Sequence, residues 1–387
     1  MTSKENYVQN AIRGLVIAYT VVAASLVAGS CTPSEKQTSA EKGPLFAYKD
    51  STGTARVVNN LPDWENKREQ ILRSMEDVMG RLPDRTRLPA FNVKLSDSLK
   101  GSGYTRYSIT LTVAEGEFLP AYFYVPVRND REAKFPAIVA LHPTGDKGKK
   151  LVDGDNPLPN RSYARELAGR GYVVIAPDYP SMGDLLDYDF SSDRYESGTM
   201  KAIFDHMRCV DFLQSLGYID PERIGVIGHS LGGHNAMFLG AFDTRLKVVV
   251  SSCGWTLFDY YDIGEEGSKK YGGRLGPWAQ DRYVPLLRER YQLDAEKIPF
   301  DFDDVIAAIA PRAFFSNSPL NDSNFDVNGV REGIKSAAQV YKFFGAENNL
   351  VVRYPQAEHD FPDDVRQEAY RFIDTILKPV STDHEDK

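Results

Sequence analysis

Residues 225–233 of this 387-residue chain read Gly-Val-Ile-Gly-His-Ser-Leu-Gly-Gly, and residues 228–232 within them match the pattern Gly-x-Ser-x-Gly. A β-branched strand sequence precedes the match from Arg223 to Ile227, and Ala, Met and Leu follow it at helical spacing as far as Gly240. A strand, a sharp turn and a helix in this order predict a nucleophile elbow, in which the turn exposes Ser230. Glycines on both sides fit a strained turn in which a Cβ atom would clash. The alternative is a small-residue turn without chemistry, and the rest of the chain decides between the two.

A serine hydroxyl becomes a nucleophile only when a base accepts its proton, and a histidine oriented by a carboxylate is the usual base. The chain has six histidines. Elbow folds use the order serine, acid, histidine, so that the base follows the last strand. His359 meets this requirement, because it lies between the last predicted strand and the last predicted helix. His384 lies in a polar tail, and four histidines stand at or before the elbow: His142, His206, His229 and His234.

The orienting acid is expected on the loop after the preceding predicted strand, which reads Asn317-Ser318-Pro319-Leu320-Asn321-Asp322. We predict Asp322 as this acid. Asp326 and Glu358 are the alternatives, and Asp322 could also serve only as a cap for local backbone amides.

The negative charge that develops on an attacked carbonyl oxygen needs two preorganised donors. The first is expected to be the backbone amide of Leu231, directly after the serine. The second should come from the loop after the strand Phe135–Leu141, which reads His142-Pro143-Thr144-Gly145. Proline has no amide hydrogen, so we predict the amide of Thr144.

The N-terminal 31 residues predict an export signal, with Lys4 and Arg13 before an apolar stretch that ends at Ala28. The sequence Ala28-Gly29-Ser30-Cys31 resembles a bacterial lipobox, in which Cys31 would carry lipid, although a lipobox normally has Leu where Ala28 stands. Secretion after cleavage nearby and a retained anchor are the alternatives. Residues 32–60 are predicted to form a tether, because they lack an apolar period over most of their length.

The remaining residues, 61–380, predict one catalytic domain. Asp63 is expected to begin a helix that Pro83 ends, and Arg106–Val113 with Phe118–Val127 should form an antiparallel hairpin. Strands and helices then alternate, which predicts an α/β fold with a mostly parallel, doubly wound sheet. The predicted strands are 135–141, 172–176, 223–227, 247–250, 313–315 and 350–353. The predicted helices are near 161–170, 199–216, 231–240, 331–344 and 363–377.

Two long connections, residues 178–198 and the insertion 254–300, leave the carboxyl ends of strands, where open α/β sheets bind ligands. The insertion is rich in aromatic residues. We predict Trp255, Trp278 and Arg282 as substrate-binding residues, whereas most of the other rings should form a local core.

Composition bears on cofactors and partners. Lys and Arg number 46 against 54 Asp and Glu, the net charge is −8, and no basic stripe is present, so nucleic acid is not an expected partner. Asp153-Gly154-Asp155-Asn156 resembles the start of a calcium loop, but its twelfth position is Ala164 rather than Glu, so no metal or other cofactor is predicted. Cys209 and Cys253 are expected to be buried free thiols. Membrane association is expected only through lipid on Cys31.

Taken together, these segments resemble the α/β-hydrolase superfamily, and within it bacterial serine esterases of the acetyl-xylan-esterase and prolyl-oligopeptidase-like group. The matching segments are ALHPTGDKGK at 140–149, APDYPSMGD at 176–184, SGTMK at 197–201, IGHSLGGHNAMFLGAFD at 227–243, SSCGW at 251–255 and EHDFP at 358–362. The resemblance implies a serine hydrolase of carboxylic esters, with acyl or methyl esters on a carbohydrate as the expected substrates. A peptidase or amidase with the same triad is the alternative, and a binding protein without turnover is a third possibility.

Overall fold

The computed structural model describes residues 42–127 and 133–378. The predicted export signal and Cys31 lie outside these residues, as do the first ten residues of the predicted tether. Within the described ranges, no helix combines the length and the apolar character that a membrane span needs.

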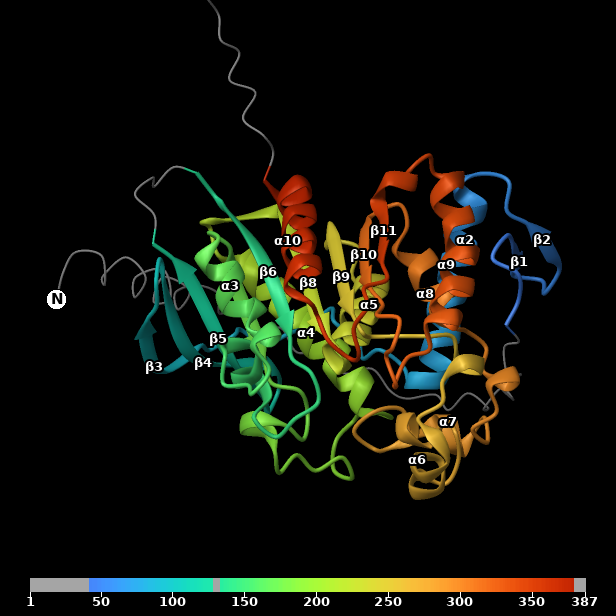
Figure 1. The fold of residues 1–387 in the computed structure, drawn as a ribbon, viewed down its shortest axis with the longest axis horizontal. Helices are drawn as coiled ribbons and strands as arrows, with labels where there is room; N and C mark the ends of the chain where they lie inside the picture. The colour runs from blue at the N-terminus through green and yellow to red at the C-terminus, as the bar shows by residue number, and fades with distance from the viewer. Residues whose placement is uncertain (1–41, 128–132, 379–387) are drawn as a thin grey trace, which may run out of the picture. The chain divides into compact units, whose positions relative to one another are not determined.

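A nine-stranded sheet organises the chain (Figure 1), in the order β11-β10-β9-β8-β6-β7-β5-β4-β3. Three antiparallel strands form one edge: β3 (Lys94–Lys100), β4 (Tyr104–Ala114) and β5 (Glu117–Pro126). The other six run parallel to one another: β6 (Phe135–Leu141), β7 (Val173–Pro177), β8 (Ile219–His229), β9 (Val248–Ser252), β10 (Ala313–Asn317) and β11 (Leu350–Arg353). The predicted α/β fold, its mostly parallel sheet and the antiparallel hairpin are confirmed.

Helices cover both faces of this sheet and enclose two apolar cores. On one face lie α3 (Tyr163–Gly169) and α10 (Asp363–Leu377). On the other lie α4 (Gly198–Ser215), α5 (Leu231–Phe242), α8 (Phe302–Ile309) and α9 (Val327–Phe343), with α2 (Leu61–Met79) packed against α8. Short 3-10 helices occupy the connections at Gly148–Asp153, Pro159–Arg161, Gly183–Leu185, Phe258–Tyr260, Gly276–Ala279, Ala295–Lys297 and Glu347–Asn349. Because the six strands β6–β11 are parallel, their carboxyl ends lie along one edge of the sheet.

The N-terminal boundary of the domain differs from the prediction. Helix α2 begins after Asn60, whose side chain accepts a hydrogen bond from the amide of Asp63, and it ends at Gly80 with φ 93° rather than at Pro83. Before it, β1 (Ala47–Lys49) pairs with β2 (Ala55–Val57). Leu45 and Val58 are buried in the core, so the prediction of a tether is wrong for this stretch.

The insertion at 254–300 has a core of its own. It contains α6 (Gly264–Tyr271) and α7 (Leu286–Glu289), and the unpredicted α8 follows it. The ring of Trp278 packs against five aromatic rings: His234, Phe258, Tyr261, Phe302 and Phe325. Trp255 is 1 % exposed, and its indole N–H donates to Ser316 Oγ at 3.0 Å. Both tryptophans are buried and hold the insertion against the domain, which supports a packing role for them, and their binding of substrate stays a prediction.

Several histidines are buried in the core in their neutral form. Burial, together with the nearby His142 and Lys201, lowers the pKa of His206, on α4, to about 3. Burial likewise lowers the pKa of His234, on α5, to about 3. In the unfolded chain such a side chain titrates near the reference value of about 6.5. Acid therefore favours the unfolded state, because only there do these rings bind a proton.

We predict that His206→Phe makes stability less sensitive to acid. The wild type loses the stabilising contribution of neutral His206 as the pH falls from about 6.5 towards 3. This loss amounts to about 1.4 kcal/mol per pH unit for one proton. Urea unfolding of both proteins between pH 6 and pH 4.5 should give a shallower fall for the variant by about this slope, whatever its absolute stability. Parallel curves would show that His206 is protonated in the folded protein.

Candidate active site

Ser230 stands at the turn between β8 and α5, with φ 55° and ψ −119°. A Cβ atom on Gly228 would collide with the carbonyl of Gly232, and one on Gly232 would collide with the carbonyl of Leu141 at the end of β6. Both glycines are therefore required by close backbone approach, as the sequence indicated. A serine in this strained conformation projects its hydroxyl from the carboxyl edge of the sheet.

His359 and Asp322 meet Ser230 at this edge. The Oγ of Ser230 lies 2.9 Å from Nε2 of His359, and Nδ1 of His359 lies 3.0 Å from both carboxylate oxygens of Asp322. A carboxylate only accepts hydrogen bonds, so Nδ1 carries the proton and Nε2 is left to accept from the serine hydroxyl. The structure thus brings together the three side chains that the sequence singled out.

The two alternative acids lie elsewhere. Asp326 accepts a hydrogen bond from the amide of Asn328 and caps α9, while Glu358 is exposed. Asp322 also accepts from the amides of Asn324 and Phe325, so it caps its loop and orients the histidine at the same time.

A buried arginine anchors the histidine loop. Arg161 is 3 % exposed, and it donates to Asp360 Oδ1 at 2.6 Å and to the carbonyl of His359 at 3.0 Å. Burial alone would raise the pKa of Asp360, but hydrogen bonds from Arg161 and Asn160 hold it below its usual value. No local pattern indicated Arg161, because 199 residues separate it from Asp360 in the loop that it holds.

Polar side chains link the strand ends behind the histidine. The side-chain amide of Asn317 donates to Ser252 Oγ at 2.9 Å and to the backbone carbonyl of Asp360 at 2.8 Å. Ser252 Oγ in turn lies 2.9 Å from Nδ1 of His229. These bonds join β8, β9, β10 and the histidine loop, and so fix the separation of the three candidate residues.

One group within the described residues has the spacing of a metal site: Cys253, Asp322 and His359, whose ligand atoms lie within 4.8 Å. Burial and the charge of Asp322 raise the pKa of the Cys253 thiol well above its usual value. The thiol therefore stays protonated, and its sulfur donates to the carbonyl of Asp360. A protonated thiol is a poor metal ligand, so these three residues fit a hydrogen-bonded cluster better than a metal centre. As expected, Cys209 and Cys253 are buried free thiols.

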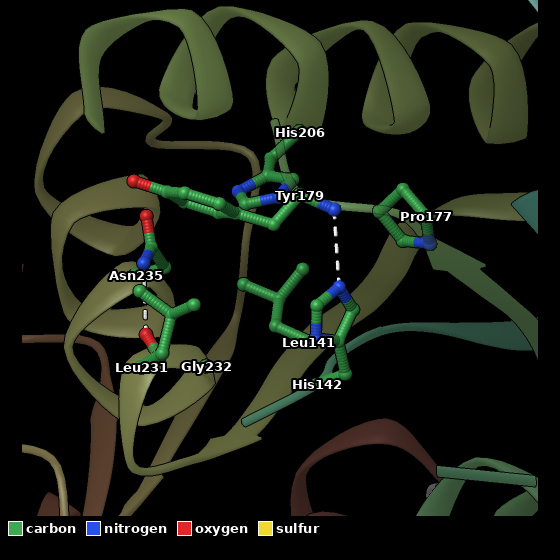
Figure 2. A pocket seen from close by; sticks show the side chains of 8 residues that line it. All are labelled: Leu141, His142, Pro177, Tyr179, His206, Leu231, Gly232 and Asn235. Carbon is green, nitrogen blue, oxygen red and sulfur yellow. Dashed lines mark hydrogen bonds between the residues drawn. The ribbon is translucent and has the colours of Figure 1, made fainter. Parts of the chain in front are cut away.

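One of the two predicted oxyanion donors, Leu231, lines a small cavity (Figure 2), together with Leu141, His142, Pro177, Tyr179, His206, Gly232 and Asn235. Leu231 is the first residue of α5, where amides have no acceptor within the helix. His142 Nε2 accepts from the amide of Tyr179 at 3.0 Å, so its Nδ1–H donates to the carbonyl of Pro143 at 2.7 Å. This neutral ring fixes the start of the loop that carries Thr144.

The connection 178–198 packs against the same loop and holds it in place. Asp178 is fully buried, and its carboxylate accepts from the amides of Lys149 and Asp184 at 2.8 and 2.9 Å. The ammonium group of Lys149, itself 3 % exposed, pairs with the carboxylate of Asp178. A Cβ atom on Gly183 would collide with this carboxylate. The connection therefore supports the oxyanion loop, a role that its sequence did not reveal.

The insertion reaches the site through residues 282 and 283. The hydroxyl of Tyr283 lies 3.0 Å from Oγ1 of Thr144, and the carbonyl of Arg282 accepts from the hydroxyl of Tyr179 at 2.6 Å. Arg282, which the sequence singled out, is thus close to the oxyanion loop. Tyr283 was missed, because aromatic composition alone does not distinguish a ring at the site from the rings of the local core.

Comparison with known proteins agrees with this geometry. A family model described as glucuronyl esterase of fungi matches residues 186–345, which include Ser230 and Asp322. The YtaP protein of Bacillus subtilis (strain 168) is 27 % identical over 80 % of this chain and 99 % of its own length. The carbohydrate esterase MZ0003, from an unknown prokaryotic organism, is 24 % identical over 77 % of this chain and 78 % of its own length.

Among solved structures, a glucuronoyl esterase from Solibacter usitatus superposes with a TM-score of 0.65 at 18 % identity, covering 88 % of this chain and 97 % of the other. The strand order, the serine elbow and these similarities agree on one fold and one kind of chemistry. The chain has the α/β-hydrolase fold, and its similarity to carbohydrate esterases identifies it as a carboxylic-ester hydrolase.

Proposed function

We propose that this protein hydrolyses esters of a carbohydrate, and that its first candidate substrates are esters formed by the carboxyl group of a uronic acid. The observation that carries the proposal is the hydrogen-bonded row from Ser230 through His359 to Asp322. The chemistry of the substrate is suggested by the glucuronyl esterase model, which matches the stretch holding the elbow, the insertion and Asp322.

The geometry supports a two-step reaction. Ser230 Oγ attacks the ester carbonyl while its proton passes to Nε2 of His359, and Asp322 stabilises the imidazolium that forms. The carbonyl oxygen becomes negatively charged beside the amides of Leu231 and Thr144. As the bond to the alcohol breaks, His359 returns the proton to the departing oxygen. Water then gives up a proton to His359 and attacks the acyl-enzyme, and His359 returns this proton to Ser230 Oγ as the acyl bond breaks and the acid is released.

Export to the cell envelope is part of the proposal, and it rests on residues 1–31. Their charged start, their apolar stretch and the segment Ala28-Gly29-Ser30-Cys31 support a lipid anchor on Cys31. A polymer substrate outside the cytoplasm would suit an anchored enzyme.

The anchor predicts that the full chain, expressed in a bacterial host with radiolabelled palmitate, incorporates label and fractionates with membranes. Cys31→Ser should lose both properties, because the thiol is the site of acylation. Label in neither protein, with enzyme in the soluble fraction, would indicate plain secretion instead.

Replacing the nucleophile predicts loss of turnover without loss of the fold. Ser230→Ala should reduce kcat on p-nitrophenyl acetate by about 10⁴- to 10⁶-fold, because no attacking atom remains. Its thermal unfolding should stay close to that of the wild type, since the hydroxyl contributes little to the core. Ser98→Ala, on exposed strand β3, is the matched control and should keep full activity. A residual rate of Ser230→Ala within tenfold of the wild type would exclude Ser230 as nucleophile.

If the substrate is a uronate ester, the enzyme should release methanol from the methyl ester of glucuronic acid. Acetate release from acetylated xylan and cleavage of an aminoacyl-anilide are measured for comparison. We expect the highest kcat/KM on the uronate ester and no measurable cleavage of the anilide. If acetate were released faster than methanol, the preferred substrates would be acyl esters of sugars instead. Preferred cleavage of the anilide would favour the peptidase alternative, and silence on all three would favour a binding protein.

A further inference from the structure

Within residues 42–127 and 133–378, the half-exposed guanidinium of Arg282 has no anionic partner. Ten other arginines in the described ranges are buried or half-buried, and each of them donates hydrogen bonds to a carboxylate or a carbonyl: Arg68, Arg85, Arg106, Arg161, Arg208, Arg223, Arg245, Arg274, Arg312 and Arg366. The guanidinium of Arg282 instead contacts an aromatic ring: its Cζ lies 6.0 Å from the ring centroid of Tyr283. This half-exposed guanidinium is therefore available to pair with an anionic ligand.

This guanidinium lies beside the candidate oxyanion hole. The hydroxyl of Tyr283 meets Thr144 Oγ1 at 3.0 Å, and the Tyr283 ring packs against the cluster that contains Tyr179 and Leu231. Burial raises the pKa of both tyrosine hydroxyls, and the positive charge of Arg282 acts against that rise in each. The Tyr283 ring thus lies between Arg282 and Thr144, whose backbone amide is the predicted second oxyanion donor.

The backbone around Arg282 is held firmly. Its carbonyl accepts the Tyr179 hydroxyl, and a Cβ atom on Gly198, at the start of α4, would collide with that same carbonyl. The side chain therefore extends from a fixed point, which lowers the entropy that is lost when it binds a ligand.

We propose that Arg282 binds a free carboxylate next to the ester, so that the preferred substrate is an acidic carbohydrate with one acid group esterified and a neighbouring one free. The inference rests on the proposed function and narrows its substrate class to partly esterified polyuronides. The planar guanidinium can donate two parallel hydrogen bonds to a carboxylate, which a neutral sugar does not offer. With a net charge of −8, the chain as a whole repels such a polymer, so attraction has to be local.

The test uses two disaccharide substrates built from two uronic acids, each carrying one methyl ester. In the first the other acid is a free carboxylate, and in the second it is the neutral carboxamide. We expect Arg282→Gln to lower kcat/KM on the carboxylate substrate about tenfold or more, mainly by raising KM. The kcat/KM on the carboxamide substrate should change less than about twofold. Arg282→Lys should recover part of the loss. Added salt should weaken the wild type on the carboxylate substrate alone.

Arg371→Gln is the matched control for charge, because this exposed arginine of α10 lies outside the site. It should leave both substrates unchanged. Equal losses on both substrates with Arg282→Gln would overturn the inference and give Arg282 a structural role.

A second measurement separates this inference from the proposed function. Free diuronate is added as an inhibitor of p-nitrophenyl acetate hydrolysis, which needs the triad but not a uronate ester. The inference predicts an inhibition constant about tenfold higher in Arg282→Gln than in the wild type. If the wild type cleaves no uronate ester yet shows this difference, the proposed function fails and the carboxylate site stands. Equal inhibition of the two proteins would overturn the carboxylate site.

Discussion

The site depends on the absence of side chains where helix α5 begins. Gly232 brings the first turn of α5 against the last carbonyls of β6, and Gly233 brings it against the end of β9. Gly228 allows the chain to turn back under that helix. The close approach fixes Ser230 in its strained conformation and sets the amide of Leu231 next to it. A single methyl group at these positions would separate the helix from the sheet and move both groups together.

Around this turn, each candidate residue is held by a partner from another part of the chain. Asp322 determines which nitrogen of His359 carries the proton, and Arg161 holds the backbone of the same loop. Asp178 and Lys149 do the equivalent for the loop of Thr144. Buried charges arranged in this way are strongly destabilising when one partner is removed. They therefore serve to fix positions more than to add stability.

Strands and helices whose pattern is local were predicted well, and contacts that depend on the tertiary fold were not. Strands β6 and β11 and helix α10 begin and end where their apolar periods do. The hairpin β1–β2 was missed, because its strands have only three residues each and the carboxylate of Asp50 organises their turn. Ser230, Asp322 and His359 could be selected because chain order constrains them. Nothing local distinguishes Tyr283 at the site from Trp278 in the core of the insertion.

The insertion between β9 and β10 packs through aromatic rings of its own and of the domain, and it meets the site through Arg282 and Tyr283. Its internal cohesion and its contact with the catalytic loops are therefore carried by different residues. Mutations at those two positions can change which ester is admitted without loosening the rings that keep the insertion folded. Such a division makes this segment a unit of evolutionary change, through which one catalytic sheet can be adapted to new polymers in small, viable steps.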